Sequence, residues 1–571
     1  MSFEFTDHAK VLLNNYYMHP DETNIHEAFR RAAYSYTEDK DLSERIYDYA
    51  CKGWFMFSSP VLSNAGTKAM PISCFLSYVD DSVEGLIEHT EELRWMSVMG
   101  GGVGGHWSDV RSVSKKAPGP IPFLKTVDAD MVAYRQGLTR KGSYAAYLDI
   151  SHPDIIEFLN MRVPTGGDDD RKCFNLNNAI NITDSFMEAV ASNSDWDLLD
   201  PNTKLVKETV SARHLWERIL EVRFRTGEPY INFIDEANRQ LPEQLKKKGL
   251  KIHGSNLCSE IHLPTSTDRS AVCCLSSLNI EFFDEWKDST IVEDLIEYLD
   301  DVLQHFIENA PSSLEKAVYS ATRERSLGLG AMGFHSYLQK NNMSFESFYA
   351  TSANRKIFSF IKERALKATK ALAKTKGAYP DDDTKMARNS HLLAIAPNAN
   401  SSIILDTSPS IEPWKSNAYT HRTRAGSFLQ LNKYLLKCLE KYAEGKSHEW
   451  LNEQIQSVIL AQGSVQHLDY LTNVEKAIFK TAFEINQMWV IEHASVRQEW
   501  ICQGQSVNLF FPAGSEKNYV NAVHLSAWKK KLKALYYLRT NSGSVGEKVS
   551  TAVKREALED YKIEECLSCQ G

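Results

Sequence analysis

Five consecutive residues near the middle of the chain, Asn256-Leu257-Cys258-Ser259-Glu260, place an amide, a thiol and a carboxylate at alternate positions. If this stretch is extended, side chains at positions i, i+2 and i+4 share one face and point into the same space. An amide can hydrogen-bond a substrate hydroxyl, a carboxylate can accept its proton, and the cysteine between them can attack or exchange a hydrogen atom. For an isolated pattern of this kind, the alternative is a buried cysteine beside a solvated loop.

A second cysteine-containing segment follows, Cys273-Cys274-Leu275-Ser276-Ser277-Leu278-Asn279. Together with the stretch from Ser255 to Ile261, it resembles the finger loop and following strand of the large subunit of class I ribonucleotide reductases. Further segments recur in the order of this family from about Phe57 to the C-terminus, so the resemblance covers most of the chain. It implies an α/β fold, a ten-stranded α/β barrel of two five-stranded halves, with a central finger loop that carries Cys258.

The resemblance also implies a reaction, the radical-based reduction of ribonucleoside diphosphates to 2′-deoxyribonucleoside diphosphates for DNA synthesis. Cys258 would be the thiyl radical that removes the ribose 3′-hydrogen, Glu260 would accept the 3′-hydroxyl proton, and Asn256 would hold a hydroxyl. Cys74 and Cys273 would supply two electrons and end as a disulfide, which needs a Cα–Cα separation of about 4.4–6.8 Å. By itself, a cysteine in an apolar strand, such as Cys74, is more often an inert part of the core.

Two pairs of residues near the C-terminus would complete the electron path. Tyr536 and Tyr537 match the family's stacked tyrosines, which relay a radical from a separate small (beta) subunit. That subunit houses a metal cofactor of the di-iron or dimanganese class, so this chain would bind no metal itself. From Asn541 the chain is polar, and we expect a flexible tail that ends in the C-x-x-C pair Cys566 and Cys569. These thiols could re-reduce the active-site disulfide by exchange and be reduced in turn by thioredoxin or glutaredoxin.

Several segments of this chain match the family's substrate-binding motifs, and each residue is assigned by its own match. The segment 57–67 resembles the first substrate-side loop, the expected first barrel strand 73–76 follows, and the glycine run 100–105 borders the substrate in the family. The segment 394–403 matches the diphosphate loop, where free N–H groups at a helix start favour an anion, although a well-capped helix is the alternative. The family's usual acidic and threonine residues are replaced here by Ala399-Asn400. The substrate residues that transfer are Ser58, Ser59, Ser73, Gly102, Ser401 and Ser402.

Another set of residues matches the family's specificity-effector site, which binds dNTP or ATP near the interface of a homodimer. Asp81 and Ser82 open a helical segment, where a carboxylate and backbone N–H groups can meet a ribose or base. Gln136 and Arg140 lie in the polar segment Gln136–Ser143, which matches the loop that carries effector identity to the substrate base. Without the resemblance, these segments would be an ordinary helix cap and a solvated loop. We find no match to the family's N-terminal ATP cone, so we expect specificity control without inhibition by dATP.

The elements that must position these residues can be outlined from the sequence pattern. Short helical patterns fill residues 1–56, and helices then alternate with short strands, which indicates an α/β domain with a largely parallel sheet. We expect one catalytic domain over residues 57–540 and the redox tail over 541–571. Within the domain, the glycine-containing segment 313–338 and the segment 474–501 both have helical patterns.

Length and composition fit a large enzyme and exclude several other classes of protein. The chain has 571 residues, of which 43% are apolar and 24% charged, enough to bury a sizeable core. A net charge of −9 argues against a general nucleic-acid surface. The sequence lacks an apolar run of membrane-spanning length, so we expect a cytoplasmic protein without a membrane partner. Ten cysteines in a reducing compartment are structural, metal-binding or redox-active.

Three alternatives stay open at this point. A cobalamin-dependent reductase would share the barrel cysteines and tail thiols but would not need Tyr536 and Tyr537. A non-catalytic nucleotide-binding regulatory homologue would have lost at least one catalytic residue, and all are present. A zinc site built from Cys566-Cys569 and Cys273-Cys274 is the third, although the second half is C-C and not C-x-x-C.

Overall fold

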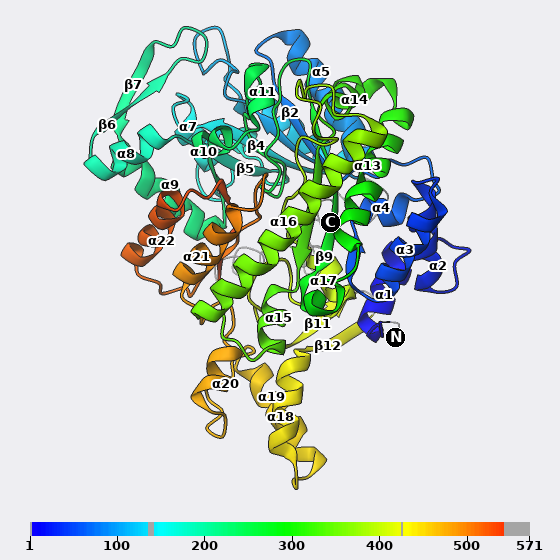
Figure 1. Ribbon diagram of the computed structural model, residues 1–571. Helices are drawn as coiled ribbons and strands as arrows, with labels where there is room; N and C mark the ends of the chain where they lie inside the picture. Colours follow the sequence, from blue (N-terminus) through cyan, green and yellow to red (C-terminus); the bar gives the residue numbers. More distant parts are fainter. Residues whose placement is uncertain (1–2, 135–141, 424–425, 542–571) are drawn as a thin grey trace.

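The N-terminal part of the protein is helical. The computed structural model describes residues 3–134, 142–423 and 426–541. The first helices are α1 (Asp7–Tyr16), α2 (Ile25–Ser35) and α3 (Lys40–Cys51), and they lie together at one side of the molecule (Figure 1). Each begins at a polar side chain, Thr6, Asn24 or Asp39, that accepts a hydrogen bond from the first turn. The expected helical lead-in is therefore present.

The first half of the barrel is a parallel sheet of five strands. In spatial order they are β2 (Cys74–Tyr78), β3 (Gly102–His106), β4 (Ser143–Asp149), β5 (Asn177–Ile182) and β8 (Tyr230–Phe233). Parallel neighbours need crossover connections, and helices supply them. The helices between these strands are α5 (Val83–Val98), α6 (Ile121–Ala133), α7 (Ile155–Asn160), α8 (Asp184–Ser192) and α9 (Ala212–Thr226). The alternation of strand and helix in the sequence predicted this half.

The second half has the same size but is less regular. Its members are β9 (Ala271–Asn279), β10 (Leu327–Met332), two extended segments at 393–395 and 504–507, and β14 (Ala534–Leu535). Parallel bridges join the first extended segment to β10 and to the second segment, and the Tyr536 N–H donates to Val507 O at 2.8 Å. The halves meet in antiparallel pairs, β2 with β9 and β8 with β14. The expected α/β barrel of two five-stranded halves is confirmed.

Long helices cover the outside of the second half. They are α13 (Ile291–Asn309), α14 (Glu315–Glu324), α16 (Phe348–Lys376), α21 (Gln487–Gln498) and α22 (Lys517–Lys529). Figure 1 shows α16 crossing the front of the barrel. A separate lobe with its own apolar core projects below, built from the hairpin β11 (Ala418–Thr423) and β12 (Gly426–Leu431) with α18 (Lys433–Ala443), α19 (His448–Leu460) and α20 (Asn473–Ile478).

The centre of the barrel holds the finger loop, residues 251–265. Leu257, Cys258 and Ile261 of this loop pack in one buried cluster with side chains from strands of both halves. The glycine run in β3 makes room for the loop, because a Cβ at Gly104 would lie only 1.8 Å from the backbone oxygen of Ser255. Glycine therefore lets the loop backbone lie directly against the strand.

Two helix predictions were wrong. Gly328 and Gly330 were expected in a helix, but they lie in β10, where a Cβ at Gly328 would come within 2.8 Å of Cys273 Sγ. Glycine is needed here for close packing inside the barrel, which a helical period does not reveal. The long helix expected over 474–501 is divided into α20 and α21, because Asn486 caps a new helix by accepting from Met488 N.

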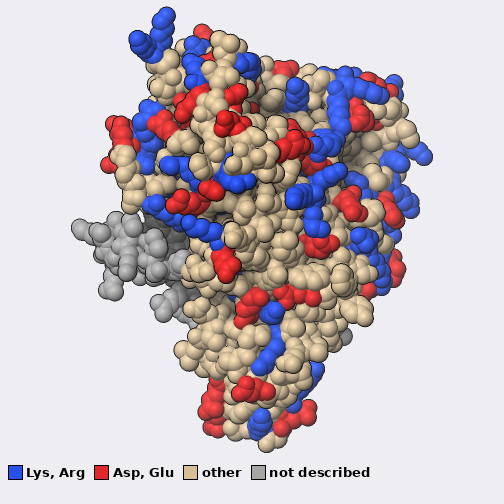
Figure 2. All heavy atoms as spheres, turned by 90° about the vertical axis from the view of Figure 1, so that its left-hand side faces the viewer, with Lys and Arg blue, Asp and Glu red and all other residues tan. Residues whose placement is uncertain are grey.

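The surface shows no single dominant charge on the face in Figure 2, where Lys and Arg side chains are interspersed with Asp and Glu. Among the helices that the structure describes, none combines the length and the apolar character that crossing a membrane requires.

We expect Gly104→Ala to displace the finger loop, because the new methyl group would occupy the position of the Ser255 carbonyl. Overpacking of this kind costs about 1–3 kcal/mol of unfolding free energy. Urea unfolding measures this loss, and the alkylation rate of Cys258 reports whether the loop has moved. Gly514→Ala is the matched control, since a Cβ there meets open space. Equal stability and equal alkylation rates in both variants would contradict the close packing.

Candidate active site

The finger loop does not have the extended form that the sequence suggested. Residues 257–259 form a turn, and Ser259 takes a left-handed backbone conformation with φ of 66°. The Asn256 side chain closes this turn, because its Oδ1 accepts from Glu260 N at 3.1 Å and from Ile261 N at 3.2 Å. The expectation of alternating side chains was therefore wrong, but the turn brings Asn256 and Glu260 together by another route.

Asn256 and Glu260 meet at one sulfur atom, Cys74 Sγ. Asn256 Nδ2 donates to this sulfur at 3.2 Å, and Glu260 Oε1 lies 3.8 Å from it. The orientation of the amide is set by its bonds, since Oδ1 already faces two backbone N–H groups and Nδ2 must point to the sulfur. Ser506 Oγ lies 3.2 Å from Glu260 Oε2 on the other side. All four side chains are buried.

Cys74 and Cys273 face each other across the junction of the two halves. They are directly opposite partners in the antiparallel pair of β2 and β9. Opposite residues in such a pair have Cα atoms about 4.5–5.5 Å apart, within the range that a disulfide spans. Burial, together with the nearby Cys74 sulfur, raises the pKa of Cys273 well above its ordinary value, so the thiol form is favoured. Among the described residues, no cysteine is in a disulfide.

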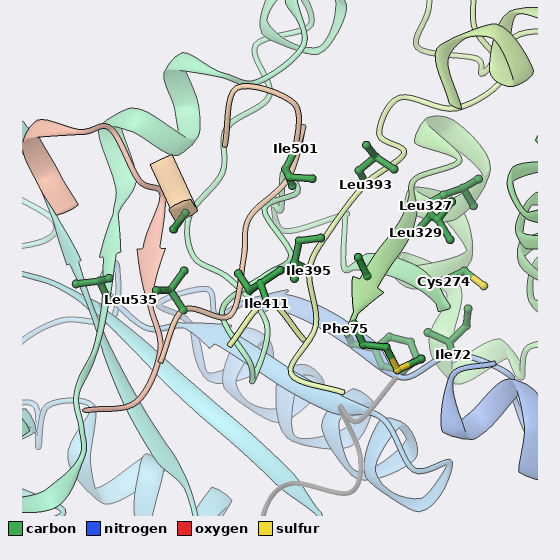
Figure 3. Packing of buried hydrophobic residues seen from close by; sticks show 14 of the residues in the cluster. Ile72, Phe75, Cys274, Leu327, Leu329, Leu393, Ile395, Ile411, Ile501 and Leu535 are labelled. Atoms are coloured by element: carbon green, nitrogen blue, oxygen red, sulfur yellow. The ribbon is translucent and has the colours of Figure 1, made fainter. Parts of the chain in front are cut away.

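The adjacent Cys274 belongs to a different environment. It packs in the outer core near Leu327 and Leu329 (Figure 3), whereas Cys273 belongs to the interior cluster. Neighbouring residues of a strand point to opposite faces. Cys273 and Cys274 therefore cannot both bind one zinc ion, and the proposed partners Cys566 and Cys569 lie outside the described residues. The described part of the chain contains no group of three or more His, Cys, Asp or Glu suited to a metal.

The tyrosine pair lies next to Cys258. The Tyr536 hydroxyl is 3.6 Å from Cys258 Sγ, and the rings of Tyr536 and Tyr537 have centroids 4.4 Å apart. The pair lies between β14 and β15 (Leu538–Thr540). A third ring, Tyr230, lies 4.7 Å from Tyr536 and 4.9 Å from Tyr537. Sequence reasoning missed Tyr230, whose only signal is an aromatic residue in the strand β8.

Two of the expected substrate residues border the cysteine pair. Gly102 is the cross-strand partner of Cys74, and its N–H donates to Ser73 O at 2.7 Å. Cys74 Sγ lies 3.7 Å from Ser73 Oγ. The start of β3 and the residue before β2 therefore form one wall beside the Cys74 sulfur.

The other substrate residues lie at the starts of two short helices, α4 (Ser59–Asn64) and α17 (Ala399–Ile404). Ser58 Oγ is buried and has no hydrogen-bond partner in the part of the chain that the structure describes. Ser59 Oγ lies 3.0 Å from the hydroxyl of Tyr17. In α17, Ser401 and Ser402 are buried, and the Ser402 hydroxyl donates to Ala399 O at 2.8 Å.

The expected effector residues are partly engaged within the protein. Ser82 Oγ accepts from Gly85 N at 2.9 Å, so this side chain caps α5. The Asp81 carboxylate is held by Arg111 Nε at 2.9 Å and by Asn202 Nδ2 at 2.8 Å. Gln136 and Arg140 lie outside the described residues. Arg111 and Asn202 were missed because nothing in the sequence links such distant positions to Asp81.

Comparison with known proteins agrees with this architecture. Residues 3–69 match the family model "Ribonucleotide reductase, all-alpha domain", and residues 72–387 and 383–538 match "Ribonucleotide reductase, barrel domain". The chain belongs to the class I ribonucleotide reductase large subunits. It is 52% identical to a putative ribonucleoside-diphosphate reductase large subunit of Frog virus 3 (isolate Goorha), over 100% of this chain and 99% of the relative. Identity to the large subunit of Invertebrate iridescent virus 3 is 42%, over 98% and 97% of the two chains.

A solved structure is also similar over nearly its whole length. The class Id ribonucleotide reductase alpha subunit of Actinobacillus ureae has a TM-score of 0.84 and 35% identity, over 95% of this chain and 98% of that chain. Class I membership means that a separate small subunit supplies the radical, and it favours a ribonucleoside-diphosphate reductase over the cobalamin-dependent and non-catalytic alternatives. The tyrosine pair beside Cys258 agrees with that class.

For this reductase, we predict that oxidation links Cys74 to Cys273 and leaves Cys274 reduced, because the first two are opposite partners and Cys274 packs in the outer core. Alkylation of the unfolded, oxidised protein followed by peptide mass spectrometry measures this. Cys274→Ser is the control and is expected to keep the same link. A disulfide that includes Cys274 would contradict the register.

Proposed function

We propose that Cys258 starts the reduction of a ribonucleoside diphosphate by removing the ribose 3′-hydrogen, with Cys74 and Cys273 as the reductant. One observation carries the proposal: Cys258, the cysteine pair and Tyr536 belong to a single buried cluster inside the barrel. Radical chemistry needs such a site, because burial excludes water and other groups that would quench a thiyl radical.

The radical enters through the two tyrosines. Tyr537 and then Tyr536 are oxidised, and Tyr536 takes the hydrogen atom of Cys258, which leaves a thiyl radical and an intact phenol. The 3.6 Å separation of the Tyr536 hydroxyl and Cys258 Sγ supports this transfer. Burial, followed by the negative charge of Glu228, raises the pKa of Tyr537, so its phenol keeps its proton until it is oxidised. The same steps in reverse return the radical at the end of turnover.

At the substrate, the thiyl radical of Cys258 takes the 3′-hydrogen while Glu260 accepts the 3′-hydroxyl proton and Asn256 holds a hydroxyl. The 2′-hydroxyl then leaves as water. Cys74 and Cys273 supply two electrons and two protons in total and become a disulfide. Cys258 gives its hydrogen atom back to C3′, so ribose and two thiols are converted to deoxyribose, water and one disulfide.

Substrate and effector sites follow from the same family. We propose that Ser58, Ser59, Ser401 and Ser402 bind the diphosphate, and that Ser73 and Gly102 border the ribose. The buried hydroxyl of Ser58 supports this, since it has no hydrogen-bond partner among the described residues. For dNTP or ATP effectors we propose Asp81 and Ser82 with Gln136 and Arg140. An effector there would have to compete with Arg111 and Asn202 for the Asp81 carboxylate.

The proposed partners are the small subunit with its di-iron or dimanganese cofactor, a second copy of this chain, and thioredoxin or glutaredoxin acting on Cys566 and Cys569. An apolar stripe on α5 supports the homodimer, because Val83, Ile87, Trp95 and Val98 are exposed along one face of this helix. The boundaries at 1–56, 57–540 and 541–571 and the cytoplasmic location remain predictions.

We predict that Cys258→Ser lowers CDP reduction about 10³-fold or more, because a hydroxyl is a far poorer hydrogen-atom donor and acceptor than a thiol. Substrate binding is expected to persist, since serine fills nearly the same space. Turnover with the small subunit and equilibrium binding of CDP are the two measurements. Cys173→Ser, a buried cysteine outside the site, is the control. Substantial deoxycytidine diphosphate formation by Cys258→Ser would overturn the assignment.

Tyr536→Phe and Tyr537→Phe are each predicted to stop turnover, because phenylalanine keeps the ring but has no oxidisable O–H. Both variants are expected to fold and to bind the small subunit. Tyr379→Phe is the matched control, since this buried tyrosine packs in a separate cluster. If both variants keep wild-type activity, or if adenosylcobalamin replaces the small subunit, the radical enters by a different route.

A further inference from the structure

Residues 503–508 contact the finger loop, the tyrosine pair and the cysteine pair. Ser506 Oγ donates to Cys258 O at 2.6 Å, and Gly504 N donates to Glu260 O at 2.7 Å. Asn508 Oδ1 accepts from Tyr537 N at 3.1 Å. The remaining contact, from Gln503, reaches the redox pair directly.

The Gln503 amide is fully buried, and each of its hydrogen-bonding groups has a partner. Oε1 accepts from His262 N at 3.2 Å, while Nε2 donates to Leu327 O at 2.9 Å and to Cys273 Sγ at 3.4 Å. A flipped amide would put its oxygen against the Leu327 oxygen and its NH₂ group against the His262 N–H. The network therefore fixes the orientation, and one N–H of Gln503 must point to the Cys273 sulfur.

Each of the two sulfur atoms of the pair accepts a hydrogen bond from a side-chain amide. Cys74 receives an N–H from Asn256 at 3.2 Å, and Cys273 receives an N–H from Gln503 at 3.4 Å. The charged groups near the two sulfur atoms differ, because the Glu260 carboxylate lies 3.8 Å from Cys74 Sγ. The Glu260 carboxylate opposes a negative charge on either sulfur, but its direct contact is with Cys74, whereas the nearest polar group to Cys273 Sγ is the neutral amide donor of Gln503.

We propose that Gln503 is a positioning residue of the redox pair, which holds the Cys273 sulfur opposite Cys74 and stabilises it as the thiolate that leaves when a dithiol reduces the Cys74–Cys273 disulfide. This rests on the proposed role of the pair. The first thiolate of the dithiol attacks the Cys74 sulfur, a mixed disulfide forms, and Cys273 departs with the electron pair. The second thiol of the dithiol then displaces Cys74, and both cysteines end as thiols after taking up two protons.

Burial makes this donor necessary. Cys273 is completely buried, and burial is the main reason that its pKa is raised, while the bond from Gln503 acts in the opposite direction. A buried thiolate without a donor is costly, and a hydrogen bond to a charged group is stronger than one between neutral groups. Removing the donor should therefore slow the step in which Cys273 leaves as a thiolate.

The test compares Gln503→Met and Gln503→Glu with Gln505→Met in the full-length chain. Gln505 is a matched control, because it is an equally buried amide of the same segment whose bonds go to Arg497, Ala494 and Gln498. Each protein is equilibrated with reduced and oxidised dithiothreitol, and the fraction of Cys74–Cys273 disulfide is measured by peptide mass spectrometry. The rate of disulfide reduction by dithiothreitol is followed from pH 6 to 9.

We expect Gln503→Met to slow reduction of the disulfide about tenfold, the size expected for loss of a hydrogen bond to a charged group, and to leave the equilibrium near that of wild type, because both reduced cysteines are neutral thiols. Gln503→Glu keeps the acceptor for His262 N but loses the donor, and its rate should fall further behind wild type as pH rises and the new carboxyl ionises. Gln505→Met should match wild type in both measurements.

A folded Gln503→Met or Gln503→Glu protein that is reduced at the wild-type rate would overturn the proposal, and so would a failure of both variants to fold, which would assign Gln503 a purely structural role. If the wild-type protein forms no Cys74–Cys273 disulfide at all, the proposed redox pair is wrong, and that result is distinct from the two above.

Discussion

The active site depends on the direct packing of the finger-loop backbone against the inner wall of the barrel. At Gly104 the wall has no side chain, and the Ser255 carbonyl occupies the space where a Cβ would be. From the other side, Ser506 and Gly504 hold the backbone oxygens of Cys258 and Glu260, and the Tyr147 hydroxyl donates to Asn256 O at 2.7 Å. Backbone anchoring leaves the side chains of the loop available for chemistry.

This anchoring explains how two kinds of chemistry share one site. The one-electron chemistry that we propose requires Cys258 beside Tyr536, and the proposed two-electron chemistry requires Cys74 opposite Cys273. The antiparallel junction of the two half-barrels supplies the cysteine pair, while the loop inside the barrel supplies Cys258, the proposed radical residue. Because the interior is buried, each hydrogen bond is stronger there than in water, and amides with fixed orientation can act on individual sulfur atoms.

Sequence reasoning could single out Asn256, Cys258 and Glu260 as candidates, because they are close in the chain and carry distinctive groups, and the structure places them in or beside one buried cluster with Cys74 and Cys273. Sequence reasoning failed where the backbone conformation determines the local structure. The turn at Ser259 has a left-handed residue that no periodicity reveals. The glycines of β10 are explained by packing within a strand and not by helix propensity. The contacts of Gln503 with Cys273 and of Arg111 with Asp81 could not be predicted, since each joins positions far apart in the chain.

The most direct test of the account is whether the hydrogen that Cys258 removes is the one at C3′. We would compete CDP deuterated at C3′ against unlabelled CDP, with the small subunit and thioredoxin present, and measure the deuterium content of the product and of the remaining substrate. CDP deuterated at C5′ is the control. The account predicts discrimination against deuterium at C3′ and none at C5′. If the enzyme consumes all three substrates equally, breaking the bond between C3′ and its hydrogen does not limit the rate at which bound substrate is committed to reaction, and this result would contradict the account.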